Sequence, residues 1–446
     1  MRALAITCLF VAACGGDDVH HLGDAPPAPD ASIDAATSGP VSLRLTLDDA
    51  PVAGINVYFQ DAASGLVATV ATGADGTATA TMEPGGYVTV VQPFLVKRNG
   101  DDVRTFAGVK PGDQLRIDER SMGPAQTTIT LTLPIDINAN TYDVYTSCSG
   151  KHTLVGSGGS GTIPSGTVYL SGCTGGLADV LVQTTDGNGA PLGWFYHPDL
   201  PVTDLATITL TDTYATTSTD VTMMFSNIPA DYTGLAFRNV TGSARGPVLD
   251  LLYAAPVTAG VATQTISRPP VTNATSVTAM HPTPTNSIGS QFVVDWGPAS
   301  VVTFDLAGAL LPLYATVPTY AIASHAVSWT AGTGVTPDFV VAEVYAERFT
   351  GAPNTSWRWR IVAPYATTIA LPVLPAPAAD YNIAAGDGPL PDGPLVDELT
   401  TAKVPGGYDA VRARLHSLRS PQDVEGLATG AAGRIVYEML ESQLQL

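Results

Sequence analysis

The sequence has little charge of either sign. Only 13% of its 446 residues are Asp, Glu, Lys or Arg, against about 25% in a typical soluble domain. This scarcity excludes a disordered polyelectrolyte, which is charge-rich, and a coiled coil, which needs abundant Glu, Lys and Leu. Basic residues are the scarcer kind, 20 against 40 acidic ones. The resulting net charge of −20 disfavours nucleic acid as a partner.

Recognisable catalytic motifs are also missing. No HExxH, GxSxG or P-loop pattern occurs. Beyond residue 40 the histidines are few and widely separated: His152, His197, His281, His325 and His416. We therefore expect a protein that is not an enzyme and that binds no cofactor or metal. A Ser-His-Asp site assembled from distant strands stays open as an alternative, because such triads are defined by geometry and not by sequence order.

Residues 1–13 predict a lipoprotein signal peptide. Arg2 supplies the positive charge, and the apolar stretch that follows is too short for a transmembrane helix, which needs about 20 residues. Val11-Ala12-Ala13-Cys14 resembles the bacterial lipobox. That resemblance implies cleavage before Cys14, its acylation by palmitate-like chains and anchoring in a membrane. The alternative is a plain secretory signal that leaves Cys14 free.

Residues 14–40 predict a disordered stalk. They are rich in Pro, Ala and Asp and contain few branched aliphatic residues, so they cannot bury enough surface to offset the entropy of ordering. His20 and His21 lie in this stretch and are expected to be solvated. Gly15 follows the acceptor cysteine, which favours the outer membrane or surface of a bacterial cell envelope over the inner membrane.

Of the four cysteines, Cys8 lies in the predicted signal peptide and Cys14 is the predicted lipid acceptor, so Cys148 and Cys173 remain. An even pair in an exported protein predicts one disulfide. A zinc site is the rival interpretation, because His152 follows Cys148 at a ligand-like spacing, but Cys173 has no such neighbour to complete four ligands. No CxxC motif supports a redox pair.

From residue 41 to about 373 the sequence is dominated by short runs of alternating polarity. Val41-Ser-Leu-Arg-Leu-Thr-Leu is the clearest example, and turn dipeptides such as Asp75-Gly76 and Asn188-Gly189 separate the runs. Short strands between regular turns are typical of sandwiches or barrels. The predicted fold class is all-β, with several tandem Ig-like or transthyretin-like β-sandwich domains and a short α-helical C-terminal tail.

The first of these domains has a specific pattern. Residues 51–59 read PVAGINVYF and residues 72–90 read TGADGTATATMEPGGYVTV. The pattern resembles the carboxypeptidase-regulatory-like (transthyretin-like) sandwich and the related collagen-adhesin B-type repeats. The resemblance covers about residues 41–92 and implies a fold, with almost no implication for function.

Six segments are predicted along the chain. They are a lipoprotein signal peptide (1–13), a stalk (14–40), a carboxypeptidase-regulatory-like sandwich with a charged excursion (41–135), a sandwich with the disulfide (136–285), an Ig-like sandwich (286–405) and a helical tail (406–446). The excursion is the charge-rich stretch 97–127, which we expect to be solvated. In the tail, residues 408–418 have helical periodicity, while residues 434–446 fit either helix or strand.

Two aromatic pairs are candidate ligand platforms. Trp194 and Tyr196 share one face of a predicted strand, as do Trp357 and Trp359, with Arg358 and Arg360 on the opposite face. Exposed aromatic rings stack on sugars, whereas buried ones would fill a sandwich core, and core packing is the commoner role. The oxygen-rich stretch Asp136-x-Asn138-x-Asn140-x-x-Asp143 lacks the glycine and glutamate of a calcium loop, so we expect an Asx turn there.

Together these patterns favour a non-catalytic, surface-anchored lipoprotein with a structural, binding or adhesive role. Its expected partners are the membrane, through the lipid anchor, and a surface glycan or protein, and we expect a monomer. The alternative is a carbohydrate-binding surface protein that uses the aromatic platforms. An enzyme with a dispersed site, for example around His197 or His325, is the third hypothesis.

Overall fold

The computed structural model describes residues 38–441 with internal gaps. The gaps are residues 48–49, 94–100, 120–126, 156–161, 171–172, 174–175, 217–218, 231, 244–245, 270–274, 285–289, 299–302, 350–354, 389–393 and 413–433. The predicted signal peptide, Cys14, His20, His21 and almost all of the predicted stalk lie outside the described residues.

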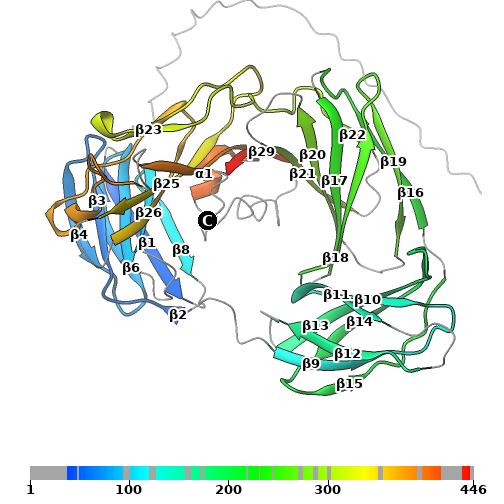
Figure 1. Cartoon of the computed structure of the whole chain (residues 1–446). Helices are drawn as coiled ribbons and strands as arrows, with labels where there is room; N and C mark the ends of the chain where they lie inside the picture. The colour runs from blue at the N-terminus through cyan, green and yellow to red at the C-terminus, as the bar shows by residue number, and fades with distance from the viewer. Residues whose placement is uncertain are drawn as a thin grey trace, which may run out of the picture. The chain divides into compact units, whose positions relative to one another are not determined.

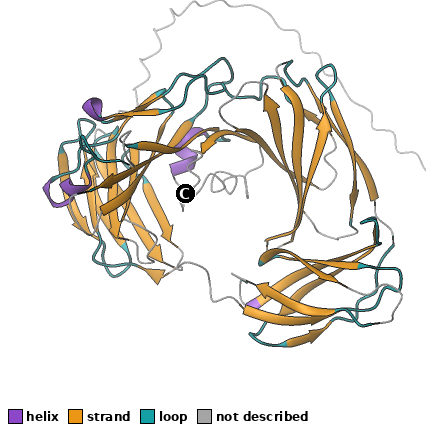
Figure 2. Ribbon diagram, in the orientation of Figure 1, coloured by secondary structure: helices purple, strands orange, loops and turns teal. Residues whose placement is uncertain are grey.

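The all-β prediction is confirmed. Strands dominate the described chain and helices are short (Figure 2). The helical elements are α1 (Gly407–Arg412) and the 3-10 helices η2 (Ile322–Ser324) and η3 (Ala376–Tyr381). Within the described ranges, no helix has the length and apolar character needed to cross a membrane.

The N-terminal strands form a small sheet around β1 (Figure 1). β1 (Gly39–Leu47) pairs antiparallel with β2 (Ala50–Pro51) and β5 (Thr77–Met82), and parallel with β8 (Gln114–Glu119). The predicted Asp75-Gly76 turn precedes β5. Gly76 has φ +75°, and a Cβ there would lie 2.4 Å from the carbonyl oxygen of Leu45. Only glycine fits this position, because both the conformation and the space exclude a side chain.

A second, 12-stranded sheet joins strands from residues 56–109 with strands from residues 232–441. Its order is β18 (Gly246–Pro256), β17 (Tyr232–Ser243), β20 (Thr275–Pro284), β21 (Ser290–Pro298), β29 (Arg434–Glu441), β28 (Leu395–Lys403), β25 (Phe339–Arg348), β26 (Thr355–Pro364), β7 (Asp101–Val109), β6 (Gly86–Pro93), β3 (Asn56–Gln60) and β4 (Leu66–Ala71). The β7–β26 pair is parallel, with Arg360 opposite Arg104. This pair joins strands that are about 250 residues apart in the sequence.

One hydrophobic core is built from both ends of the sequence. Val41, Leu43 and Phe59 pack with Phe339 and Tyr408, and all five side chains are buried. β1 contributes Val41 and Leu43 to this core because every second residue of a strand points to the same face of the sheet. Residues 41–117 and 339–411 therefore fill one core together.

The expectation that residues 97–127 are a solvated charged excursion is wrong for β7, whereas the side chains of Lys110, before β8, and Arg116, on β8, are 52% and 36% exposed. Residues 101–109 form β7, which lies inside the 12-stranded sheet, and residues 114–119 form β8. Arg104 is only 3% exposed, because its guanidinium pairs with Asp102. Charged side chains that are paired in this way can be buried, which a composition argument cannot detect.

The stretch from residue 127 to 209 contributes two facing sheets with their own core. One sheet contains β11 (Ser149–Val155), β10 (Thr141–Thr146), β13 (Leu177–Thr185) and β14 (Pro191–Pro201), and the other contains β12 (Ser165–Leu170), β9 (Thr127–Thr132) and β15 (Thr207–Thr209). Ile129, Leu131, Val144 and Phe195 are buried between them.

Two further three-stranded sheets complete the described fold. One contains β19 (Ala262–Arg268), β16 (Thr219–Ser226) and β22 (Thr303–Asp305), and the other contains β23 (Thr319–Ala321), β24 (Ala326–Ser328) and β27 (Thr368–Ala370). In the core beside the first of these sheets, Phe225 stacks on Phe304 and makes a tilted ring contact with Phe237. Val327 joins the core that contains Trp357 and Trp359.

Strand pairing runs across three of the predicted boundaries. β9 and β12 lie on either side of the boundary at 135–136 and are paired. β20 and β21 lie on either side of the boundary at 285–286 and are neighbours in one sheet. β28 and β29 lie on either side of the boundary at 405–406 and are also paired. The C-terminal segment thus contributes the short helix α1 and a strand, and residues 434–441 take the strand alternative.

Candidate functional site

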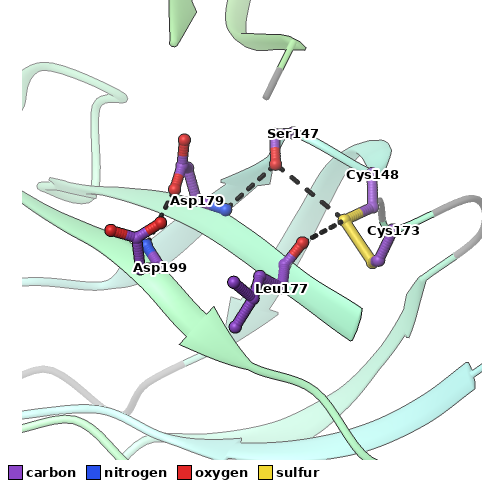
Figure 3. Close-up of a disulfide and its surroundings, with 6 residues drawn as sticks. All are labelled: Ser147, Cys148, Cys173, Leu177, Asp179 and Asp199. Carbon is purple, nitrogen blue, oxygen red and sulfur yellow. Dashed lines mark hydrogen bonds between the residues drawn. A yellow bond between two sulfur atoms is a disulfide. The ribbon is translucent and has the colours of Figure 1, made fainter. Parts of the chain in front are cut away.

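The predicted disulfide is present. Cys148 lies in the turn between β10 and β11, and Cys173 precedes β13, so the bond ties two parts of one small sheet together (Figure 3). The two Cα atoms are 4.8 Å apart, and 25 residues separate the cysteines in the sequence. Both side chains pack against the core of the 127–209 sheets. His152 lies on β11 and is half-buried, and burial lowers its pKa.

A buried aspartate lies beside the disulfide. Asp179 is 3% exposed and sits at a register shift of the β13–β14 pair. Its carboxylate accepts a hydrogen bond from the Asp199 N–H at 2.8 Å, and its own N–H donates to Ser147 Oγ at 2.9 Å (Figure 3). Asp199 has φ +55°, a left-handed conformation that aspartate tolerates. These contacts hold the ends of three strands around the disulfide.

Removal of the disulfide is expected to destabilise the 127–209 sheets. The double variant Cys148→Ser/Cys173→Ser should lose about 3 kcal/mol of unfolding free energy, because the reduced chain regains the entropy of a 25-residue loop. Chemical denaturation under oxidising conditions measures the difference. Wild-type protein treated with a reductant is the matched control and should behave like the variant. An unchanged midpoint in both samples would contradict the expectation.

Trp357 and Trp359 do not form an exposed platform. Each is 1% exposed, and both point into the core that lies on one face of β25 and β26. Trp359 Nε1 donates to Thr105 Oγ1 at 3.0 Å. The Arg348 guanidinium carbon lies 5.0 Å from the Trp357 ring centroid, a cation–π contact. A sugar cannot reach rings buried in this way, so these tryptophans fill the core, which was the other interpretation of the sequence.

Trp194 is buried as well, and Tyr196 is half-buried. Trp194 is 2% exposed and lies in a cluster with Tyr145, Leu181 and Leu249. Tyr196 packs against the same cluster. The strand face shared by Trp194 and Tyr196 is therefore an internal packing face, and the ring of Trp194 is inaccessible to a ligand in this structure.

The most unusual polar feature is a row of charged side chains across the 12-stranded sheet. Arg104, Arg360, Glu343 and Glu398 are register partners on the adjacent strands β7, β26, β25 and β28. We name these four residues the charged row. All four are at most 9% exposed. They share the sheet face of Val341 and Val362, at the border of the core built from both chain ends.

Glu343 is the centre of the charged row. One of its carboxylate oxygens accepts a hydrogen bond from Arg358 Nη1 at 2.8 Å, and the other accepts from Arg360 Nη2. Arg358 is 48% exposed and also pairs with Asp397 at 3.1 Å. Arg360 Nη2 lies 4.0 Å from a Glu398 oxygen. Arg358, which is not a member of the charged row, thus links buried Glu343 to the surface.

The electrostatics of the row keep Arg360 charged. Burial alone would lower the Arg360 pKa, but the nearby carboxylates of Glu343, Glu398 and Asp102 raise it. Arginine cannot lose its proton in a protein, so its charge must be balanced by a partner. Glu343 supplies that balance through a direct ion pair. Of the two arginines on the strand face opposite Trp357 and Trp359, Arg358 is therefore half-exposed and Arg360 is buried.

Sequence reasoning missed the charged row. The signal available was Glu343 inside the run Phe339-Val-Val-Ala-Glu-Val-Tyr-Ala, whose other residues are apolar or aromatic. A charge at the centre of such a run indicates a buried partner elsewhere in the sheet. Nothing in the local sequence shows that the partners are Arg360 on the next strand and Glu398 more than 50 residues away.

In the described part of the chain, the two histidines considered for a dispersed catalytic site, His197 and His325, each have a single side-chain partner. His197 Nδ1 lies 3.0 Å from Asp212 Oδ2, and His325 Nδ1 lies 3.1 Å from the Tyr320 hydroxyl. Burial raises the pKa of Tyr320 to about 12, so this hydroxyl stays protonated at neutral pH. Among the described residues, the partners of these histidines are a carboxylate and a phenol, and neither histidine is hydrogen-bonded to a serine as a catalytic triad requires.

The oxygen-rich stretch 136–143 forms the expected Asx turn. Asp136 Oδ1 accepts from the Asn138 N–H at 3.1 Å. Asp143 turns to other partners, Thr153 Oγ1 at 2.7 Å and Lys151 Nζ at 2.8 Å. Across the described ranges, no group of three or more His, Cys, Asp or Glu residues is arranged to hold a metal ion.

Comparison with known proteins adds little. No family model and no curated protein matches the chain. Among solved structures, the chain is similar to the Bacillus anthracis TIE protein at 13% identity and a TM-score of 0.16, over 55% of this chain and 45% of that one. It thus spans less than half of the TIE protein. A tetra-tandem repeat from the extending region of a large adhesion protein gives 13% identity and a TM-score of 0.12, over 82% and 94% of the two chains. Likenesses this weak carry no argument about function.

Proposed function

We propose that the chain is a non-catalytic, lipid-anchored protein of a bacterial cell surface with a structural or adhesive role. The observation that carries the proposal is that the side chains able to bind a ligand or do chemistry serve to hold the fold together. The tryptophans fill cores, the charged row joins four strands, and the cysteines close a sheet. In the described chain these groups hold strands together, which is what a load-transmitting or display scaffold requires.

The anchor part of the proposal rests on Val11-Ala12-Ala13-Cys14, which resembles a lipobox. Three acyl chains at Cys14 would hold the protein stably on a membrane, since each buried CH₂ contributes about 0.8 kcal/mol. A proline-rich stalk behind the anchor would hold the sandwiches away from the lipid.

Substitution of Cys14 tests the anchor. In a bacterial host that lipidates proteins, Cys14→Ala should abolish incorporation of labelled palmitate and move the protein from the membrane fraction to the soluble fraction. Cys8→Ala is the matched control, because Cys8 belongs to the part that is removed, and it should change neither readout. Mass spectrometry of the mature N-terminus gives the direct measurement. An unmodified Cys14, or a mature chain that starts elsewhere, would refute the anchor.

A further inference from the structure

Strand β4 leaves one edge of the 12-stranded sheet open. β4 ends the strand order, and in the described part of the chain it pairs with β3 alone. Its sequence, Leu-Val-Ala-Thr-Val-Ala, contains no charge and no proline. Natural edge strands are usually protected by such residues. Two other edge strands of this protein have them, namely β14 with Pro191, Pro198 and Pro201 and β8 with Arg116, Asp118 and Glu119, whereas the shorter edge strand β15 does not.

Main-chain groups of β4 point outward from the open edge. The Thr72 N–H donates to the Ile55 carbonyl at 2.9 Å, so Thr72 faces β3. In an antiparallel ladder the direction alternates, which turns the N–H and C=O groups of Thr69 and Ala71 away from β3. Both residues are exposed. An added strand would find its main-chain hydrogen-bond partners there.

Apolar side chains accompany these main-chain groups. Leu66 is 49% exposed and Val67 is 47% exposed. Ala68 and Val70 are half-buried against the core beneath. A strand that pairs with β4 would cover Leu66 and Val67 and would extend the sheet beside Ala68 and Val70. This combination of open ladder and exposed apolar residues is the basis of recognition by strand addition.

Exposed carboxylates lie at the end of β4 where the strand begins. Asp61, in the β3–β4 turn, and Glu83, before β6, are both exposed. Their turns are adjacent, since a Cβ at Gly85 would lie 3.7 Å from Ala62 Cβ. At the other end of β4, Asp75 already has Arg44 as a nearby cation. The start of β4 is therefore the acidic end of this edge.

We propose that β4 binds an extended segment of another protein by antiparallel strand addition. The segment would have apolar residues at alternate positions and a basic residue at the end that meets Asp61 and Glu83. A second copy of this chain fits less well, because two molecules of net charge −20 repel each other. The inference rests on the proposed binding role but not on the lipid anchor, so the Cys14 and β4 tests can fail independently.

A synthetic peptide provides the test. The full-length chain is titrated into fluorescein-labelled Lys-Thr-Val-Thr-Val-Thr-Val-Lys, and binding is followed by fluorescence anisotropy. We expect saturable binding that Val67→Lys weakens at least tenfold, because a lysine on the edge blocks pairing and repels the basic peptide. Glu83→Gln should weaken binding by about two- to fivefold, the range of one exposed ion pair.

Matched controls separate edge pairing from general stickiness. Val317→Lys changes a valine that is 61% exposed elsewhere and should leave binding unchanged. A peptide with proline at its centre should not bind, since proline removes a donor and breaks the ladder. Circular dichroism confirms that Val67→Lys is folded.

Two results would overturn the proposal. The first is absence of binding, or binding that is equal for wild type and Val67→Lys. The second is a dimer of the chain in analytical ultracentrifugation that Val67→Lys dissociates, because the occupant of the edge would then be a second copy.

Discussion

Replacement of Glu343 with glutamine is expected to lower the free energy of unfolding by about 3–5 kcal/mol, the range measured when one partner of a buried ion pair is removed. Glutamine keeps the shape of the side chain but leaves the buried Arg360 guanidinium without its direct counter-charge. Urea denaturation, followed by tryptophan fluorescence and circular dichroism, measures the loss.

Two control variants test the reason for this loss. Arg358→Gln removes the half-exposed partner of Glu343 and should cost no more than about 1 kcal/mol, as for a surface ion pair. The paired change Glu343→Leu/Arg360→Met removes both charges and should recover most of the stability lost in Glu343→Gln. If Glu343→Gln and Arg358→Gln lowered the unfolding free energy by the same small amount, the ion pairs of the charged row would behave like surface ion pairs, and the expectation would be wrong.

Truncation of Trp359 to alanine is expected to cost about 3–5 kcal/mol, the usual range for a buried tryptophan. The indole is 1% exposed, and its Nε1–H donates to Thr105 on β7. The variant would therefore open a cavity at the β7–β26 junction and leave the Thr105 hydroxyl without this donor. Trp359→Phe keeps most of the volume and should cost less.

Alanine variants of both tryptophans decide between a role in core packing and a role as a sugar-binding platform. A core role predicts a lower unfolding free energy for both Trp357→Ala and Trp359→Ala, with no ligand needed to explain it. A sugar platform predicts the opposite pattern, in which Trp357→Ala keeps wild-type stability and loses binding on a glycan array. The second pattern would contradict the burial described above.

Local sequence patterns predicted the strands better than their partners. The alternation of residues 41–47, the Asp75-Gly76 turn and the single cysteine pair all have their predicted structures. The strand and the turn are determined by residues within their own segments. The disulfide follows because two cysteines remain to pair with each other. The all-β class follows from the same evidence, because period-two runs and turn residues recur throughout the chain.

Strand partners and buried charges were not predicted, for a common reason. A charged residue in an isolated segment indicates exposure, and so the stretch 97–127 was expected to be solvated. Arg104 is nevertheless buried, with its guanidinium paired to Asp102, because the pairing of β7 with β26 places its strand inside the sheet. Pairing between strands this far apart leaves no trace in the local pattern of either strand.

The shared core has a consequence for the order of events during synthesis. Residues 41–117 complete their core only when residues 339–411 are present. At about 5–20 residues per second, a ribosome needs roughly 10–45 seconds to make the intervening stretch. During that interval the edge of β7 that later pairs with β26 has no partner from its own chain. The first module to emerge is thus among the last to finish folding, because its core closes only around strands from the other end of the chain.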